Sequence, residues 1–125
     1  MQSLISHSET SDGRHTSKLV INDNSLVYFY RTKPNDHGEL DKLSLFLDNV
    51  ANNKGASLKI CRKPGIRLHW DSEKRNISVE QYSSGLYTSI SLVLETEAAQ
   101  LVINWLTGIR TETAGECLET IDYVR

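Results

Sequence analysis

The chain has 125 residues, of which 38% are hydrophobic and 24% are charged, and its formal net charge at pH 7 is −2. A chain of this length can bury roughly two-thirds of its unfolded surface in one domain, so its fold does not require a disulfide or a structural metal. The small net charge excludes a general attraction to nucleic acid or anionic membranes, and no apolar run is long enough to span a bilayer. Because the N-terminus has no signal-peptide pattern, we expect a cytoplasmic protein whose two cysteines, Cys61 and Cys117, stay reduced.

Residues 1–17 have the composition of a flexible arm. Ser, Thr, His and charged residues dominate this segment, and Leu4 and Ile5 are its main apolar residues. Such a segment gains too little from apolar burial to offset the entropy lost on ordering it. We therefore expect an N-terminal arm over 1–17, followed by a single domain over 18–110.

A hairpin and a helix are predicted next. Lys18–Ile21 and Leu26–Arg31 are rich in β-branched and aromatic residues, and Asn22–Ser25 between them favours a turn. After a break at Pro34–Gly38, apolar residues recur at the spacing of a helix face, and the helix is expected to end near Asn52–Gly55. The apolar residues are Leu40, Leu43, Phe46, Leu47 and Val50.

Four runs of alternating apolar and polar residues occupy 57–94. Alternation puts the apolar side chains of a strand on one face, which must then be buried. Turn-forming residues at Lys63–Gly65, Asp71–Asn76 and Ser83–Gly85 separate the runs and predict an antiparallel meander. The apolar positions are Leu58, Ile60, Ile66, Leu68, Trp70, Ile77, Val79, Ile90, Leu92 and Leu94.

A second helix follows the meander. From Glu95 the apolar residues take the spacing of a helix face, and Gly108 is placed to end the helix. The predicted order is β-β-α-β-β-β-β-α, an α+β fold with an antiparallel sheet and this helix packed on its apolar face. Beyond it, 111–125 is an acidic segment that we expect to dock in part. The apolar helix residues are Ala98, Leu101, Val102, Trp105 and Leu106.

Positive charge is concentrated in one part of the chain. Residues 54–75 hold seven cations and two carboxylates, a net charge of +5 in a chain whose total is −2. Alternation places several of these cations beside two tyrosines on the polar face of the meander. Cations beside aromatic rings can bind the phosphates and unstacked bases of single-stranded nucleic acid, although an ordinary solvated sheet face carries the same residue types. The predicted binding face carries Lys59, Lys63, Arg67, His69, Tyr82 and Tyr87.

The sequence contains no catalytic, metal-binding or cofactor-binding motif. Its four histidines include no pair at the i, i+4 spacing of a helical zinc site. They are His7, His15, His37 and His69. Cys61 is a lone cysteine on a predicted strand, where a cysteine more often packs than reacts. We therefore predict no catalytic residue, no metal and no cofactor.

The last part of the predicted meander resembles a known family. Asn76–Tyr82 and Ser89–Glu95, the latter leading into the helix that carries Leu101 and Trp105, are similar to the end of a strand-meander-plus-helix unit. That unit belongs to the positive-cofactor-type transcriptional coactivators and their whirly-like relatives. The resemblance implies binding of single-stranded DNA by a dimer.

Three classes of function are consistent with the sequence. The first is a small non-catalytic binding protein that acts through a protein partner, as an inhibitor, immunity factor, adaptor or anti-defence protein does. The second is a protein that binds single-stranded DNA or RNA with the basic and aromatic sheet face. The third is an enzyme whose site is not readable from sequence order. A homodimer is compatible with the first two classes, and no membrane partner is expected.

Overall fold

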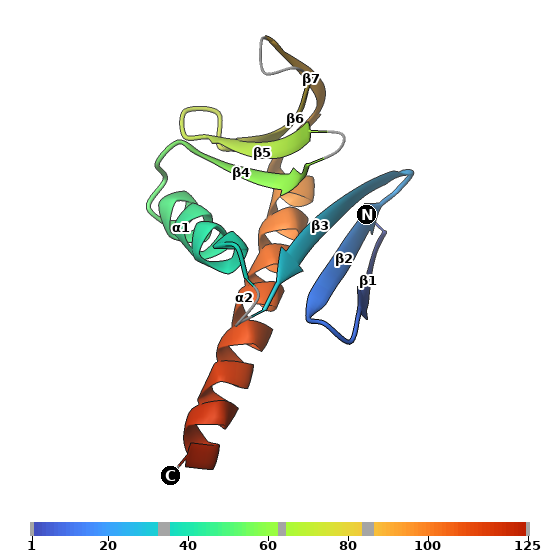
Figure 1. Cartoon of the computed structure of the whole chain (residues 1–125). Coiled ribbons are helices and arrows are strands. Elements are labelled where there is room, and N and C mark those ends of the chain that lie inside the picture. The colour runs from blue at the N-terminus through green and yellow to red at the C-terminus, as the bar shows by residue number, and fades with distance from the viewer. Residues whose placement is uncertain (1, 33–35, 63–64, 84–86, 125) are drawn as a thin grey trace.

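The computed structural model describes residues 2–32, 36–62, 65–83 and 87–124, and for 82, 83, 87–91 and 114–124 it describes the backbone alone. Within these residues the chain forms seven strands and two helices (Figure 1). In chain order they are β1 Ser3–Glu9, β2 Arg14–Ile21, β3 Asn24–Arg31, α1 Glu39–Ala51, β4 Ala56–Cys61, β5 Gly65–Asp71, β6 Asn76–Ser83, β7 Tyr87–Leu94 and α2 Thr96–Val124.

The strands form two antiparallel meanders. The first sheet has the order β1-β2-β3 and the second β4-β5-β6-β7. Both helices pack across the junction of the two sheets, because α1 contacts β3 and β4 while α2 contacts β2, β6 and β7. The predicted α+β class with antiparallel strand pairing is therefore confirmed, although the strands are divided between two sheets where one was predicted. From β2 onward the element order is the predicted one.

The core lies between the helices and the inner faces of both sheets. Leu43 and Phe46 of α1 meet Val102 and Trp105 of α2 there, together with the alternate apolar residues of β2 to β6. The burial of Leu58, Leu68, Trp70, Ile77 and Val79 matches the predicted alternation. Trp105 is also buried, as the helical spacing predicts.

The N-terminal segment differs from the expected flexible arm. It forms β1 and the start of β2, with seven consecutive residue pairs from Ser3↔Ile21 to Glu9↔His15. No side chain of β1 is buried. Backbone pairing, and not apolar burial, therefore orders this strand, and for that reason composition does not reveal it.

The second helix is longer than predicted. Gly108 does not end it, and α2 continues to Val124, so the backbone of the acidic segment is helical. Figure 1 shows this second half of α2 running beyond both sheets. The predicted partial docking of 111–125 would depend on the side chains of 114–125. These side chains lie outside the described part of the chain. Across the described ranges, no helix combines the length and the apolar character needed to cross a membrane.

The β2–β3 turn yields a test of backbone strain. Ile21 pairs with Asn24, so Asn22 and Asp23 make the turn, and Asn22 has a φ of 53°. Asparagine tolerates this left-handed conformation, whereas alanine is penalised by about 1 kcal/mol. We expect Asn22→Ala to lower the free energy of unfolding by about that amount in urea denaturation, and Asn22→Gly to have little effect. Equal stabilities for Asn22→Ala and the control Asp23→Ala would contradict this.

Candidate functional site

The sequence-predicted binding face is formed in part. Lys59, Arg67 and Glu80 lie opposite one another on β4, β5 and β6, and Ser57, His69 and Ser78 form the adjacent row. Lys59 is exposed and Arg67 and His69 are partly exposed, so neither helix covers them.

The charges on this face largely cancel. Arg67 Nε donates to Glu80 Oε1 over 3.1 Å. Lys59 and Arg67 are balanced by Glu80 and Asp71, which leaves no net charge on the described part of this face when His69 is neutral. Backbone N–H groups of Lys74 and Glu73 donate to the Asp71 carboxylate and lower its pKa, so Asp71 stays ionised near neutrality. The described part of this face therefore carries no net positive charge, although residues 54–75 as a whole have a net charge of +5.

The other three predicted residues do not complete the face. Lys63 lies outside the described residues, and for Tyr82 and Tyr87 only the backbone is described. Val79 pairs with Leu92 and Glu80 with Ile90, so Ser91 is an extra residue in β7. This bulge reverses the alternation beyond it. The register positions of Tyr82 and Tyr87 consequently fall on opposite faces of the sheet, which corrects the prediction that the two tyrosines share a face.

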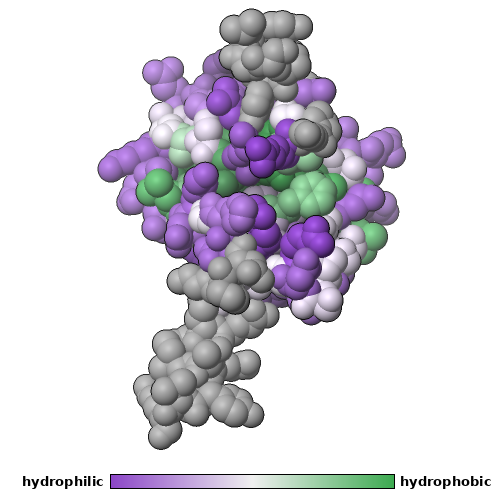
Figure 2. Space-filling model, viewed as in Figure 1, coloured by the Kyte–Doolittle hydropathy of each residue, from purple (hydrophilic) through white to green (hydrophobic). Residues whose placement is uncertain are grey.

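An apolar groove lies between the two sheets instead. It has a volume of about 490 Å³, with one wall formed by β3 and the other by β4 to β7. In Figure 2, hydrophobic surface is visible between the sheets near the centre of the view. The apolar side chains that line the groove are Leu26, Val27, Phe29, Ile60, Ile66, Val79 and Leu92, and Cys61 is on the same wall as Ile60.

The exposure of these side chains differs along the groove. Ile60 and Val79 are buried in the wall formed by β4 to β7, while Val27, Ile66 and Leu92 are partly buried. Phe29 is 50% exposed even though its strand neighbours Tyr28 and Tyr30 are buried. The groove thus leaves a large aromatic side chain open to solvent on a strand that is apolar on both faces.

A sequence signal for this groove exists in β3. Leu26, Tyr28 and Tyr30 alternate with Val27 and Phe29, so both faces of the strand are apolar. A strand at the surface of an antiparallel sheet ordinarily has one polar face. The run at 26–30 therefore indicates a second apolar surface, which the distribution of cations along the chain does not reveal.

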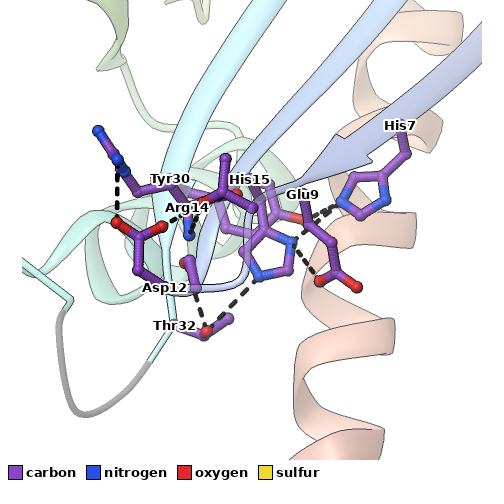
Figure 3. Close-up of polar contacts among 9 residues, drawn as sticks. His7, Glu9, Asp12, Arg14, His15, Tyr30 and Thr32 are labelled. Carbon is purple, nitrogen blue, oxygen red and sulfur yellow. Dashed lines mark hydrogen bonds and ion pairs between the residues drawn. The ribbon is translucent and has the colours of Figure 1, made fainter.

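A histidine cluster joins β1 to β2 and β3 (Figure 3). His7 Nε2 and His15 Nδ1 are 3.0 Å apart, and Glu9 Oε2 is 3.4 Å from the same His15 nitrogen. His15 is 7% exposed and stacks on Tyr30 with ring centroids 4.8 Å apart. His15 Nε2 lies 3.5 Å from Thr32 Oγ1, so each of its ring nitrogens has a polar neighbour. The cluster holds the edge strand by polar contacts and ring stacking.

The described side chains offer little for catalysis. No group of three His, Cys, Asp or Glu side chains within the described ranges is arranged to hold a metal ion. Ser57 Oγ lies 2.9 Å from His69 Nδ1, but Asp71 is engaged by the backbone of the following turn. A second hollow of about 590 Å³ beside Phe29 carries Arg14 and Arg31, and both arginines form ion pairs with carboxylates.

Comparison with known proteins adds no family assignment. No family model matches the chain, and neither the curated proteins nor the solved structures include a match. The resemblance to single-stranded DNA-binding coactivators stays a prediction.

Proposed function

We propose that the protein is a non-catalytic binding protein that takes up an apolar segment of a partner protein in the groove between its two sheets. Inhibitors, immunity factors, adaptors and anti-defence proteins act by this kind of stoichiometric binding. The observation that carries the proposal is the half-exposed Phe29, which lines the groove together with six other apolar side chains, while Asn24 and Ser25 add a polar part to the β3 wall.

The groove has the features of a protein-binding site. Exposed apolar surface costs free energy in water, and a contiguous apolar patch on a small domain typically marks an interaction site. Aromatic side chains that fit a pocket contribute most to protein interfaces. Since strands form both walls, sheet hydrogen bonds already hold the backbones of the walls in place. Binding of a partner would therefore lose little conformational entropy in the groove.

Charges near the groove suggest the composition of the bound segment. Lys18 is exposed opposite Val27, and the exposed Arg62 follows Cys61. Asp23 lies in the β2–β3 turn, directly before Asn24, which lines the groove. Two cations against one carboxylate favour a segment with apolar side chains at its centre and an acidic residue beside them.

Nucleic acid is the alternative occupant. It would require cations free to neutralise several phosphates. Arg14, Arg31 and Arg67 each form an ion pair with a carboxylate. These three cations therefore give weaker support to nucleic-acid binding than the groove gives to binding of a protein.

Selection from a random peptide display library tests the proposal. Peptides that bind the full-length protein should be rich in apolar residues and carry acidic flanks. We expect Phe29→Asp to weaken their binding by about tenfold or more, because the substitution puts a charge in an apolar contact. Leu45→Asp is the matched control, since Leu45 is exposed on α1 and does not line the groove.

Two results would contradict the proposal. The first is selection of peptides that bind Phe29→Asp as tightly as the wild type. The second is tight binding of a single-stranded oligonucleotide, with affinity that falls steeply as salt rises, in a protein that selects no peptide. Circular dichroism and thermal melting of both variants establish that the fold is retained.

A further inference from the structure

β1 has an unpaired outer edge. It is the terminal strand of its sheet, and no described strand lies beyond it. The Gln2 carbonyl accepts from the Asn22 N–H and the Thr10 N–H donates to the Arg14 carbonyl, so even-numbered residues pair with β2. Backbone groups alternate in direction along a strand. The N–H and C=O groups of Ser3, Ile5, His7 and Glu9 therefore point outward.

This edge lacks the features that usually prevent strand addition. Natural edge strands are protected by prolines, lysines, bulges or a covering element. β1 contains neither proline nor lysine, and its register with β2 is regular over seven pairs. By contrast, β7 at the far edge of the second sheet has a bulge at Ser91. β1 is thus an edge that favours pairing with another strand more than β7 does.

Apolar side chains lie on both faces of the edge. Leu4 is 67% exposed and Ile5 is 56% exposed, and consecutive residues of a strand point to opposite faces. A strand added at this edge would cover both side chains. On the side of β2, the side chains of His7 and Glu9 contact His15 and hold β1 in place. The backbone of β1 is therefore already ordered for pairing.

We propose that β1 pairs antiparallel with β1 of a second copy of this chain, forming one continuous six-stranded sheet across a twofold axis. Full overlap of the seven residues puts the axis at Ser6. Ser3 then lies opposite Glu9 of the second copy, and Ile5 opposite His7 of the second copy. The two Ile5 side chains become diagonal neighbours on one face.

Charge favours this arrangement over the parallel one. Parallel pairing in register would put Glu9 beside Glu9 of the second copy, and His7 beside His7 of the second copy. Antiparallel pairing places each Glu9 opposite a serine and separates the two carboxylates by most of the length of both strands. A twofold strand pair is also self-complementary, which a closed dimer requires. The groove lies on the β3 side of the first sheet, so a dimer would present two grooves.

Analytical ultracentrifugation of the full-length protein tests the pairing. We expect a concentration-dependent dimer with a dissociation constant on the order of micromolar, since strand pairing alone makes a small interface. Ile5→Lys should weaken the dimer about tenfold or more, because a lysine on an edge strand opposes addition. Val93→Lys, at an exposed apolar position of β7, is the matched control and should leave the dimer unchanged. A wild-type protein that stays monomeric, or an equal effect of both lysines, would overturn the proposal.

Cysteine cross-linking tests the register. In a background with Cys61→Ser and Cys117→Ser, oxidation should link the two copies through Ser6→Cys, because position 6 lies opposite itself across the axis. Ser8→Cys should cross-link far less, since it faces Leu4 of the second copy. Equal cross-linking at both positions would overturn the pairing about Ser6, whereas failure to bind peptides would bear only on the groove.

Discussion

Replacing Trp105 with alanine should lower the free energy of unfolding by about 3–5 kcal/mol, the usual cost of removing a buried aromatic side chain. Trp105 lies in the N-terminal half of α2 and is 2% exposed. Its Nε1 donates a hydrogen bond of 2.7 Å to Ser17 Oγ on β2. The substitution would open a cavity where α2 meets the first sheet and would leave the buried Ser17 hydroxyl without this partner. Two-state urea denaturation followed by far-ultraviolet circular dichroism measures the loss.

A double-mutant cycle separates the cavity from the hydrogen bond. Trp105→Phe keeps most of the ring volume but removes the donor, so it should cost less than Trp105→Ala and still leave the Ser17 hydroxyl unpaired. An unpaired buried polar group costs about 1–3 kcal/mol. Adding Ser17→Ala to Trp105→Phe should therefore recover part of the stability. A Trp105→Ala variant as stable as the wild type would disprove this description of the core.

The helices and strands that are stabilised by burial of apolar side chains could be predicted from the sequence. α1 and the strands from β2 to β6 carry apolar residues with the period of a helix or a strand, and the structure buries most of those residues. β1 has no such pattern, because it is held by backbone pairing and by His7 and Glu9 on His15. The continuation of α2 past Gly108 likewise has no strong local signal, since glycine inside a helix is tolerated at a modest cost.

The candidate site was harder to predict because it depends on register. A single extra residue, Ser91, reverses the alternation that placed Tyr87 beside Tyr82. The Arg67–Glu80 ion pair likewise depends on which residues of β5 and β6 are opposed. The groove forms only when β3 faces the second sheet, yet its signal, a strand with two apolar faces, is present in residues 26–30.

Glu39 connects the end of β3 to the start of α1. Glu39 Oε1 accepts a hydrogen bond of 2.9 Å from Arg31 Nε. Glu39 Oε2 accepts a hydrogen bond of 2.6 Å from the backbone N–H of His37. Burial would raise the pKa of the Glu39 carboxyl, but the hydrogen bonds from the backbone N–H groups and from Arg31 outweigh burial and lower the pKa. The carboxylate also lies in the first turn of the helix, where the dipole favours negative charge.

Glu39→Gln should consequently lower the free energy of unfolding by about 1–2 kcal/mol at pH 7, as loss of charged hydrogen bonds predicts. A carboxyl whose pKa is lowered by folding stabilises the protein above its unfolded pKa, and this contribution disappears as pH falls through the folded pKa. The difference between Glu39→Gln and the wild type should therefore shrink toward zero in urea titrations run from pH 7 to pH 3. Asp41→Asn, an exposed first-turn carboxylate, is the control and should lose only a few tenths of a kcal/mol. A Glu39→Gln deficit that persists undiminished at pH 3 would mean that the side-chain amide disturbs packing, and that the lowered pKa does not account for the stability.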